Sequence, residues 1–385
     1  MILGFRSTPL SETRSRKSKA LLLFSLALLG VVSSVGTLSV TIHTTMGASK
    51  AFDYVTIILM ENNGLCDILT TTLGGCAGIG SGTYMTSLAT SYALATHYTA
   101  MTHPSEPNYI ALTSGSTSGI TSDGNCCFQS SGPNIIDRIE ASGRTWKAFA
   151  EDSTNSGTCS FMPPRAADHF PFLEFSDMNT VSRCSNFLTA TSPNDQEIIN
   201  VLNESNPPNF LWLTPNDQDN MHSSSVSIGD SYLQTLVPQI LNSLTFKTKN
   251  AARFIVFDEG SDSCPSSSSG DCVYAAWAGP AAKPAFASNN QYDHYSFLKT
   301  LETVWGLSSL TSNDSDASPM TEFFQANAQP LGGPSSNPSS SPFPNSSPSN
   351  WLWIAVPIIA VAALGLVLAL SVHSRRERNH VTVQH

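Results

Sequence analysis

The chain has 385 residues, of which 41% are hydrophobic and 12% are charged, and its formal net charge is −10. The hydrophobic share is large enough for a sizeable core, so a wholly disordered chain is excluded. The negative charge argues against a nucleic-acid-binding protein, because binding to phosphate backbones depends on an excess of Lys and Arg. The length allows one large domain or two small ones.

Residues 1–42 have the order of a secretory signal. Five basic side chains lie within residues 1–19, and an apolar run from Ala20 to Val32 follows them. Ser34-Val35-Gly36 then provides a cleavage site of small residues. Because the apolar character continues to Ile42, an uncleaved N-terminal signal anchor is the alternative.

Residues 351–372 predict a C-terminal transmembrane helix. The run contains no charged residue and is long enough to cross about 30 Å of hydrocarbon. Trp351 and Trp353 mark one membrane interface, and the basic tail of residues 373–385 marks the cytoplasmic side. This topology places residues 43–350 outside the cell. The chain is then a cell-membrane protein with one span, or with two if the N-terminal segment is uncleaved.

Residues 43–331 are expected to form the folded domain, and residues 332–350 a stalk. The stalk sequence, GGPSSNPSSSPFPNSSPSN, is too rich in Pro, Ser and Asn to pack a core. Residues 43–350 carry 27 of the 29 acidic side chains but only 11 of the 19 basic ones. An acidic exterior of this kind repels anionic molecules unless metal ions neutralise the site.

All eight cysteines lie in the part of the chain that is predicted to be outside the cell. Their even number favours structural disulfides, and no Cys-x-x-Cys pair with zinc spacing is present. The sequence does not fix the connectivity. Proximity along the chain suggests the pairs Cys66–Cys76, Cys159–Cys184 and Cys264–Cys272.

Several short apolar runs end directly in polar residues. Continuous apolar runs without alternation are typical of strands that are buried on both faces, and helical stretches separate these runs. The sequence therefore predicts an α/β fold with a largely parallel central sheet flanked by helices. The predicted strands span residues 54–60, 145–150, 210–213, 253–257 and 273–278, and the predicted helices span residues 134–142, 230–244 and 296–305.

Two of these predicted strands end in pairs of candidate metal ligands. Glu61-Asn62 follows the strand of residues 54–60, and Asp258-Glu259 follows the strand of residues 253–257. In sheets of this class, ligands bind beyond the carboxyl ends of the strands. Carboxylates that meet there repel one another unless a cation gathers them, so a divalent metal is expected. The alternative is that each polar residue only caps or turns the chain.

The segment HPSEPNYIALTSG, residues 103–115, contains the candidate nucleophile. Pro107 suits the first turn of a helix that Gly115 ends. Ser105 is then expected at the helix N-terminus, where free N–H groups favour an alkoxide and an incoming phosphate oxygen. A metal beside it would lower the pKa of the hydroxyl. In the alternative interpretation, Ser105 is an ordinary helix N-cap.

Five motifs in the same order make the chain resemble the phosphoesterase family of secreted acid phosphatases and bacterial phospholipases C, within the alkaline-phosphatase-like superfamily. Together they span about residues 53–307. The motifs are Met60-Glu61-Asn62, residues 103–115, Thr214-Pro215-Asn216 with Asp219 and His222, Phe257-Asp258-Glu259-Gly260, and Tyr292-Asp293-His294-Tyr295-Ser296.

The resemblance implies roles for individual residues. Ser105 resembles the family's nucleophile, which forms a phosphoseryl intermediate. His169 and His222 resemble histidines that hold the phosphate or protonate the leaving group. Tyr109 stands four residues past Ser105, where a sulfatase has Arg, so sulfate esters are rejected as substrates. The implied metal ligands are Glu61, Asn62, Ser105, Asp258 and Glu259.

This ligand set consists of oxygen atoms, which favours Mg²⁺, Ca²⁺ or Mn²⁺. If the histidines also bind the metal, Zn²⁺ or Fe becomes plausible. The predicted function is metal-dependent hydrolysis of small phosphate monoesters, as in acid phosphatases. The alternatives are a phosphodiesterase of the phospholipase C type and a non-catalytic surface binding protein that keeps the fold. The sequence indicates no protein partner.

Overall fold

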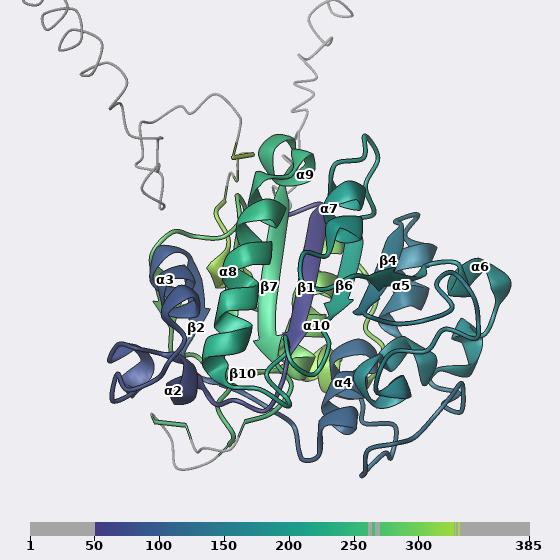
Figure 1. Ribbon diagram of the computed structural model, residues 1–385, viewed down its shortest axis with the longest axis horizontal. Helices are drawn as coiled ribbons and strands as arrows, with labels where there is room; N and C mark the ends of the chain where they lie inside the picture. The colour runs from purple at the N-terminus through teal and green to yellow at the C-terminus, as the bar shows by residue number, and fades with distance from the viewer. Residues whose placement is uncertain (1–50, 261–263, 266–269, 327, 329, 332–385) are drawn as a thin grey trace, which may run out of the picture. The chain divides into compact units, whose positions relative to one another are not determined.

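The computed structural model describes residues 51–260, 264–265, 270–326, 328 and 330–331 (Figure 1). The predicted signal segment, stalk, transmembrane helix and basic tail lie outside these residues. Among the residues that are described, no helix combines the length and the apolar character needed to cross a bilayer.

The described residues form an α/β fold around an eight-stranded sheet. Strand β8 pairs antiparallel with both of its neighbours, and the other pairings in this sheet are parallel. The prediction of a largely parallel sheet is therefore confirmed, with β8 as the exception. In spatial order the strands are β5 (Phe187–Ala190), β4 (Trp146–Glu151), β6 (Phe210–Thr214), β1 (Tyr54–Met60), β7 (Ala251–Phe257), β8 (Ala275–Ala278), β2 (Ala93–Ala95) and β9 (Phe286–Ser288).

Helices cover both faces of this sheet, and Figure 1 shows α8 in front of the central strands and α10 behind them. Helices α3, α7 and α9 contact α8, whereas α4 and α11 contact α10. The helices are α2 (Leu65–Ile68), α3 (Thr83–Ser91), α4 (Ser105–Ser114), α5 (Ile135–Ala141), α6 (Val181–Cys184), α7 (Gln196–Leu202), α8 (Val226–Asn242), α9 (Leu244–Thr248), α10 (His294–Trp305) and α11 (Ser312–Asp316). Shorter elements are the 3-10 turns η1 (Leu73–Gly75), η2 (Ala166–His169), η3 (Pro171–Leu173), η4 (Ser176–Met178) and η5 (Thr321–Phe323), and the two-stranded sheet of β3 (Tyr98–Thr99) and β10 (Tyr292–Asp293).

Strands β1 and β7 lie side by side at the centre and place the site. Their parallel register pairs Tyr54 with Ala251 at one end and Met60 with Phe257 at the other. Ile57 and Ile58, which point to opposite faces of β1, are both fully buried, as expected for a strand covered on two sides. Because the two strands end at the same level, the polar residues that follow them meet at one edge of the sheet.

The predicted helices are present, with boundaries that shift by a few residues. Asn134 caps α5 by accepting a hydrogen bond from the backbone N–H of Ile136. Helix α8 begins earlier than predicted, at Val226. Helix α10 begins at His294, because Asp293 serves as its N-cap, and it ends before Gly306, which has a positive φ of 68°.

The three disulfides suggested by sequence proximity are all present. Bonds join Cys66 to Cys76, Cys159 to Cys184, and Cys264 to Cys272. The fourth bond joins the neighbouring cysteines 126 and 127. No cysteine is free in the described part of the chain, so the preference for disulfides over a cysteine metal cluster is confirmed.

Candidate active site

Ser105 is the first residue of α4. Pro104 precedes it as the N-cap residue, with an extended backbone and no capping side chain, and Gly115 ends the helix in a left-handed conformation with φ of 72°. The alternative that Ser105 is an ordinary N-cap is therefore wrong, because the cap position belongs to Pro104. The hydroxyl of Ser105 lies at the helix N-terminus, as predicted, and its side chain is buried.

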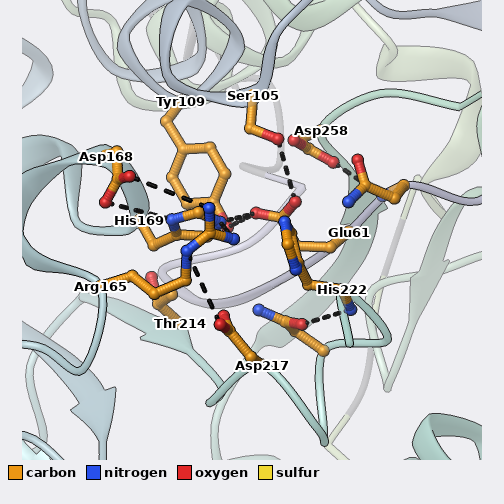
Figure 2. A network of polar contacts seen from close by, with 12 residues as sticks. Glu61, Ser105, Tyr109, Arg165, Asp168, His169, Thr214, Asp217, His222 and Asp258 are labelled. Carbon is orange, nitrogen blue, oxygen red and sulfur yellow. Dashed lines mark hydrogen bonds and ion pairs between the residues drawn. The ribbon is translucent and has the colours of Figure 1, made fainter. Parts of the chain in front are cut away.

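The hydroxyl of Ser105 lies between carboxylates from two strand ends. Its Oγ donates to Oε2 of Glu61 over 3.1 Å (Figure 2). A longer contact of 3.5 Å reaches Oε1 of Glu259. Glu61 follows β1 and is fully buried, whereas Glu259 follows β7 and is 8% exposed. The structure thus brings together the predicted nucleophile and two of the predicted metal ligands.

Asp258 and Asn62 complete the predicted ligand group. The backbone N–H of Asn62 donates to Oδ1 of Asp258 over 3.1 Å, and Asn62 has a positive φ of 59°, which asparagine tolerates better than most residues. Burial, followed by the charges of Glu61 and Glu259, raises the pKa of Asp258 well above its usual value. Burial also raises the pKa of Glu259, to about 7, with the charge of Glu61 adding to the effect and that of His103 opposing it.

His169 contacts the other oxygen of Glu61. Its Nε2 lies 2.9 Å from Oε1 of Glu61, and the hydroxyl of Tyr109 donates to the same oxygen. Burial by itself would raise the pKa of Glu61, but the charge of His169 and the hydrogen bonds from His169 and Tyr109 outweigh it and lower this pKa. Burial likewise opposes a charge on His169, but its contacts with Asp168 and Glu61 raise its pKa to about 10.

His222 lies beside His169, in the loop between β6 and α8. The two rings pack edge to face with centroids 5.6 Å apart. The backbone N–H of His222 donates to Oδ1 of Asn220 over 2.7 Å, and its Nδ1 lies 3.1 Å from Oγ of Ser223. One ligand atom from each of Glu61, His169 and His222 lies within 4.8 Å of the others. Both predicted histidines therefore belong to the same site as Ser105.

These residues fit a divalent cation. Oδ2 of Asp258 is buried and has no hydrogen-bond partner among the described residues. Such an atom costs free energy unless a proton or a cation satisfies it. Three carboxylates that would repel one another in a buried site point to the same requirement. Oε2 of Glu61 lies beside Oγ of Ser105, whereas Oε1 lies beside Nε2 of His169, and His222 is also close to Glu61. Both hard and borderline cations therefore have donor atoms here.

Several site residues were missed by the sequence analysis. Tyr109 and Asn108 lie in the quoted helix motif, but nothing in the sequence showed that Tyr109 reaches Glu61, or that Nδ2 of Asn108 reaches Oε2 of Glu259 over 3.3 Å.

His103 and Arg165 were missed as well. His103 lies 3.1 Å from Oε2 of Glu259 and 3.3 Å from Oδ2 of Asp271. Arg165 lies 2.9 Å from His169 and follows two prolines, a pattern that carries no functional signal.

Comparison with protein families gives the class to which this fold and site belong. The profile of the Phosphoesterase family matches residues 80–308, more than half of the chain. The chain therefore belongs to the phosphoesterase family, and with it to the hydrolases that act on phosphoric esters. This confirms the family expected from the motifs.

Individual relatives are phosphatases. The chain is 29% identical over 281 residues to phosphatidylinositol-3-phosphatase of Mycobacterium tuberculosis, covering 72% of this chain and 84% of that protein. It is 26% identical over 234 residues to a probable acid phosphatase of Kluyveromyces lactis, covering 58% of this chain and 53% of that protein. The phosphate-repressible acid phosphatase of Penicillium chrysogenum is 25% identical over 240 residues, with coverage of 59% and 55%. The chain thus spans about half the length of these fungal relatives.

Solved structures with a similar fold are more distant. A protein of the alkaline phosphatase superfamily from Vibrio parahaemolyticus has a TM-score of 0.45 and 13% identity, with 68% of each chain covered. Murine ectonucleotide pyrophosphatase/phosphodiesterase 5 has a TM-score of 0.49 and 9% identity, covering 71% of this chain and all of that one.

Proposed function

We propose that the protein hydrolyses phosphate monoesters through a phosphoserine at Ser105, with a divalent cation bound beside it. The observation that carries this proposal is the position of Oγ of Ser105, at the N-terminus of α4 and 3.1 Å from Oε2 of Glu61. A purely structural serine would not need buried carboxylates from two strand ends around it. The phosphatase names of the relatives support a monoester substrate, and the mycobacterial relative extends the candidates to phosphoinositides.

In this mechanism, Oγ of Ser105 attacks the phosphorus in line with the leaving oxygen, and the bond from phosphorus to that oxygen breaks. Oε2 of Glu61 accepts the hydrogen bond of the attacking hydroxyl and takes its proton as the bond to phosphorus forms, and the N–H groups at the start of α4 stabilise the developing negative charge. His222 or His169 gives a proton to the departing alcohol. Water then hydrolyses the phosphoserine and releases inorganic phosphate.

A bound divalent cation would supply positive charge that lowers the pKa of the Ser105 hydroxyl and neutralises the phosphoryl oxygens. We propose that it is held by oxygen atoms, which favours Mg²⁺, Ca²⁺ or Mn²⁺. A requirement for Zn²⁺ or Fe would instead indicate that His169 and His222 bind the cation, since their nitrogens lie near Glu61. The proposed ligands are Glu61, Asn62, Ser105, Asp258 and Glu259.

The test uses the full chain with a phosphomonoester, a phosphodiester and phosphatidylcholine, each with a series of metals and with chelator. We expect monoester turnover that the chelator abolishes. Acid quench with labelled monoester should label the wild-type protein and leave Ser105→Ala unlabelled and inactive. Preferred turnover of the diester would favour the phospholipase C alternative. Full activity in Ser105→Ala would exclude the phosphoserine mechanism.

We further propose that this reaction takes place on the outer side of the cell membrane. The support is the uncharged run of residues 351–372 with its basic tail, and the use of all eight cysteines, which suits an oxidising compartment. Protease added outside intact cells should cut within residues 332–350 and release soluble, active enzyme. Accessibility of the C-terminal tail from outside, with activity retained on the cell, would contradict this orientation.

A further inference from the structure

The guanidinium of Arg165 reaches the centre of the site, although neither the sequence motifs nor the mechanism above uses it. Arg165 lies just before η2, and Figure 2 shows its side chain between His169 and Asp217. Its Nη1 is 2.9 Å from Nε2 of His169, whose other close neighbour is Oε1 of Glu61. The side chain therefore brings a permanent positive charge close to the buried carboxylate of Glu61, with only the ring of His169 between them.

The acidic side chains near Arg165 lie too far from its guanidinium nitrogens to form strong ion pairs. Its Nε lies 3.6 Å from Oδ2 of Asp217, and its Nη2 lies 4.0 Å from Oδ2 of Asp168. Strong guanidinium–carboxylate pairs are bidentate, with N–O distances of about 2.7–2.9 Å. Both distances here are longer, and the Arg165 side chain is 25% exposed. Most of its N–H donors therefore remain available to a ligand.

The contact between Arg165 and His169 conflicts with the contact between His169 and Glu61. Nε2 of His169 lies 2.9 Å from a guanidinium nitrogen, which can only donate, and 2.9 Å from a carboxylate oxygen, which can only accept when ionised. A proton on Nε2 suits Glu61 and opposes Arg165, whereas a lone pair suits Arg165 and opposes Glu61. Glu61 and His169 are 0% and 3% exposed, so Arg165 is the partner that can move.

The chemistry of the substrate provides a reason for Arg165 to move. A phosphoryl group brings negative charge toward Glu61, Asp258 and Glu259, and a single divalent cation offsets only part of the resulting repulsion. The planar fork of an arginine matches two phosphoryl oxygens, and Arg keeps its charge at every working pH. A monoester carries a second negative charge above a pKa of about 6 and has three non-bridging oxygens, whereas a diester has one charge and two such oxygens.

We propose that Arg165 leaves His169 when substrate binds, donates two hydrogen bonds to non-bridging oxygens of the phosphoryl group, and thereby makes the site prefer monoesters to diesters. The inference rests on the proposed function, because it assigns a specificity residue to the same reaction. It also gives Asp217 and Asp168 a role, since they keep the guanidinium near the site in the absence of substrate.

The experiment compares wild type, Arg165→Gln, Arg165→Lys and the control Arg138→Gln. Nη2 of Arg138 donates to the main-chain oxygen of Ser309 over 3.2 Å, and Arg138 has no place in the proposed reaction. The measurements are kcat and KM for p-nitrophenyl phosphate and for bis(p-nitrophenyl) phosphate, and the competitive inhibition constant of inorganic phosphate. Melting temperatures show which variants are folded.

For Arg165→Gln we expect about a tenfold or larger increase in the phosphate inhibition constant and in the monoester KM, because loss of a charged hydrogen bond costs at least a factor of this size. The diester KM should change less than about threefold. Arg165→Lys should recover part of the loss, because it restores the charge without the planar fork. Arg138→Gln should match wild type.

A phosphate inhibition constant in Arg165→Gln within about twofold of wild type would overturn the inference. So would an equal loss of kcat for both substrates with the phosphate constant unchanged, since this would mean that Arg165 only positions His169. Ser105→Ala is assayed in parallel. If Ser105→Ala keeps full turnover, the proposed function itself fails. If Ser105→Ala is inactive while Arg165→Gln binds phosphate normally, only the role of Arg165 is wrong.

Discussion

Nε2 of His294 donates to the main-chain oxygen of Asp258 over 2.7 Å. This bond joins the first residue of α10 to the residue that follows β7 and carries a site carboxylate. Burial lowers the pKa of His294 to about 4, which keeps the ring neutral. Its Nδ1, 3.2 Å from the hydroxyl of Tyr98, is then free to accept a hydrogen bond. His294 is fully buried and thus connects the start of α10 to the end of β7.

His294→Ala should therefore weaken both the fold and the site. Loss of two buried hydrogen bonds and creation of a cavity should lower the free energy of unfolding by about 2–4 kcal/mol. Because Asp258 would lose the hydrogen bond that fixes its main chain, metal affinity should fall as well. Urea unfolding and metal titration of the same samples measure the two effects. Unchanged metal affinity in a destabilised variant would show that His294 supports the fold but not the metal site.

Asp258→Asn should weaken metal binding more than it weakens folding. The substitution removes a ligand charge, but it also removes one of the three mutually repelling carboxylates. Chelator should therefore lower the melting temperature of wild type more than that of Asp258→Asn. Calorimetry with and without chelator, followed by metal titration, gives both quantities. Equal metal affinity in the two proteins would place the cation elsewhere.

Tyr109→Phe tests the hydrogen bond to Glu61 without changing the shape of the core. Tyr109 is fully buried, and its hydroxyl donates to Oε1 of Glu61. A hydrogen bond to a charged group contributes about 1.5–3 kcal/mol, so the variant should be less stable by that order. We also expect kcat to fall about tenfold, because Glu61 loses a group that orients it beside Ser105. Thermal unfolding and steady-state kinetics check the two parts, and wild-type values for both would show that the hydroxyl is dispensable.

The convergence of Glu61, Ser105, Asp258 and Glu259 could be predicted from the sequence. Parallel strands end at the same edge of a sheet, and the apolar runs of β1 and β7 were recognisable as buried strands. Ser105 could be placed because Pro107 and Gly115 delimit its helix.

The remaining site contacts could not be predicted, since they depend on how long loops fold over that edge. Arg165 and His169 lie in the irregular chain between β4 and β5, where no hydrophobic period fixes a position. The direction of β8 was missed for a similar reason, because a continuous apolar run has the same pattern in a parallel and an antiparallel strand. Strands β2, β5 and β9 were not predicted, and each has only three or four residues.

Arg253→Met should stabilise the protein. Arg253 lies in β7 and is 1% exposed, and its Nε and Nη1 have no hydrogen-bond partner in the part of the chain that the structure describes. Burial lowers its pKa, because an apolar environment disfavours the charged form. Methionine fills a similar volume without a buried charge, so the free energy of unfolding should rise by about 1–3 kcal/mol. Arg253→Ala is the comparison variant and should destabilise, because it leaves a cavity. A loss of stability in Arg253→Met would mean that the guanidinium is satisfied within the fold.

Because of the buried carboxyl of Glu151, we expect the protein to lose stability as the pH rises. Glu151 is the last residue of β4 and is fully buried. Its Oε2 accepts a hydrogen bond from the backbone N–H of Asn216 over 2.9 Å, and its carboxyl also makes hydrogen bonds with the carboxyl groups of Asp195 and Asp219. Burial, followed by the charge of Asp195, raises the pKa of Glu151 to about 10, and burial raises that of Asp195 to about 7. Both acids therefore hold their protons more tightly in the folded protein than in the unfolded chain.

A carboxyl whose folded pKa lies above its unfolded value stabilises the fold fully below the unfolded value, near 4.5 for Glu. This contribution is lost as the pH rises from there toward the folded pKa, because the unfolded chain releases the proton first. Glu151→Gln keeps the neutral shape at every pH. The variant and wild type should therefore be about equally stable at pH 4, whereas at pH 8 the variant should be more stable by about 1–3 kcal/mol. Glu204→Gln, an exposed substitution, should change stability by less than about 0.5 kcal/mol at either pH. Urea unfolding at the two pH values measures these differences, and equal stability of Glu151→Gln and wild type at pH 8 would show that ionised Glu151 is accommodated in the fold.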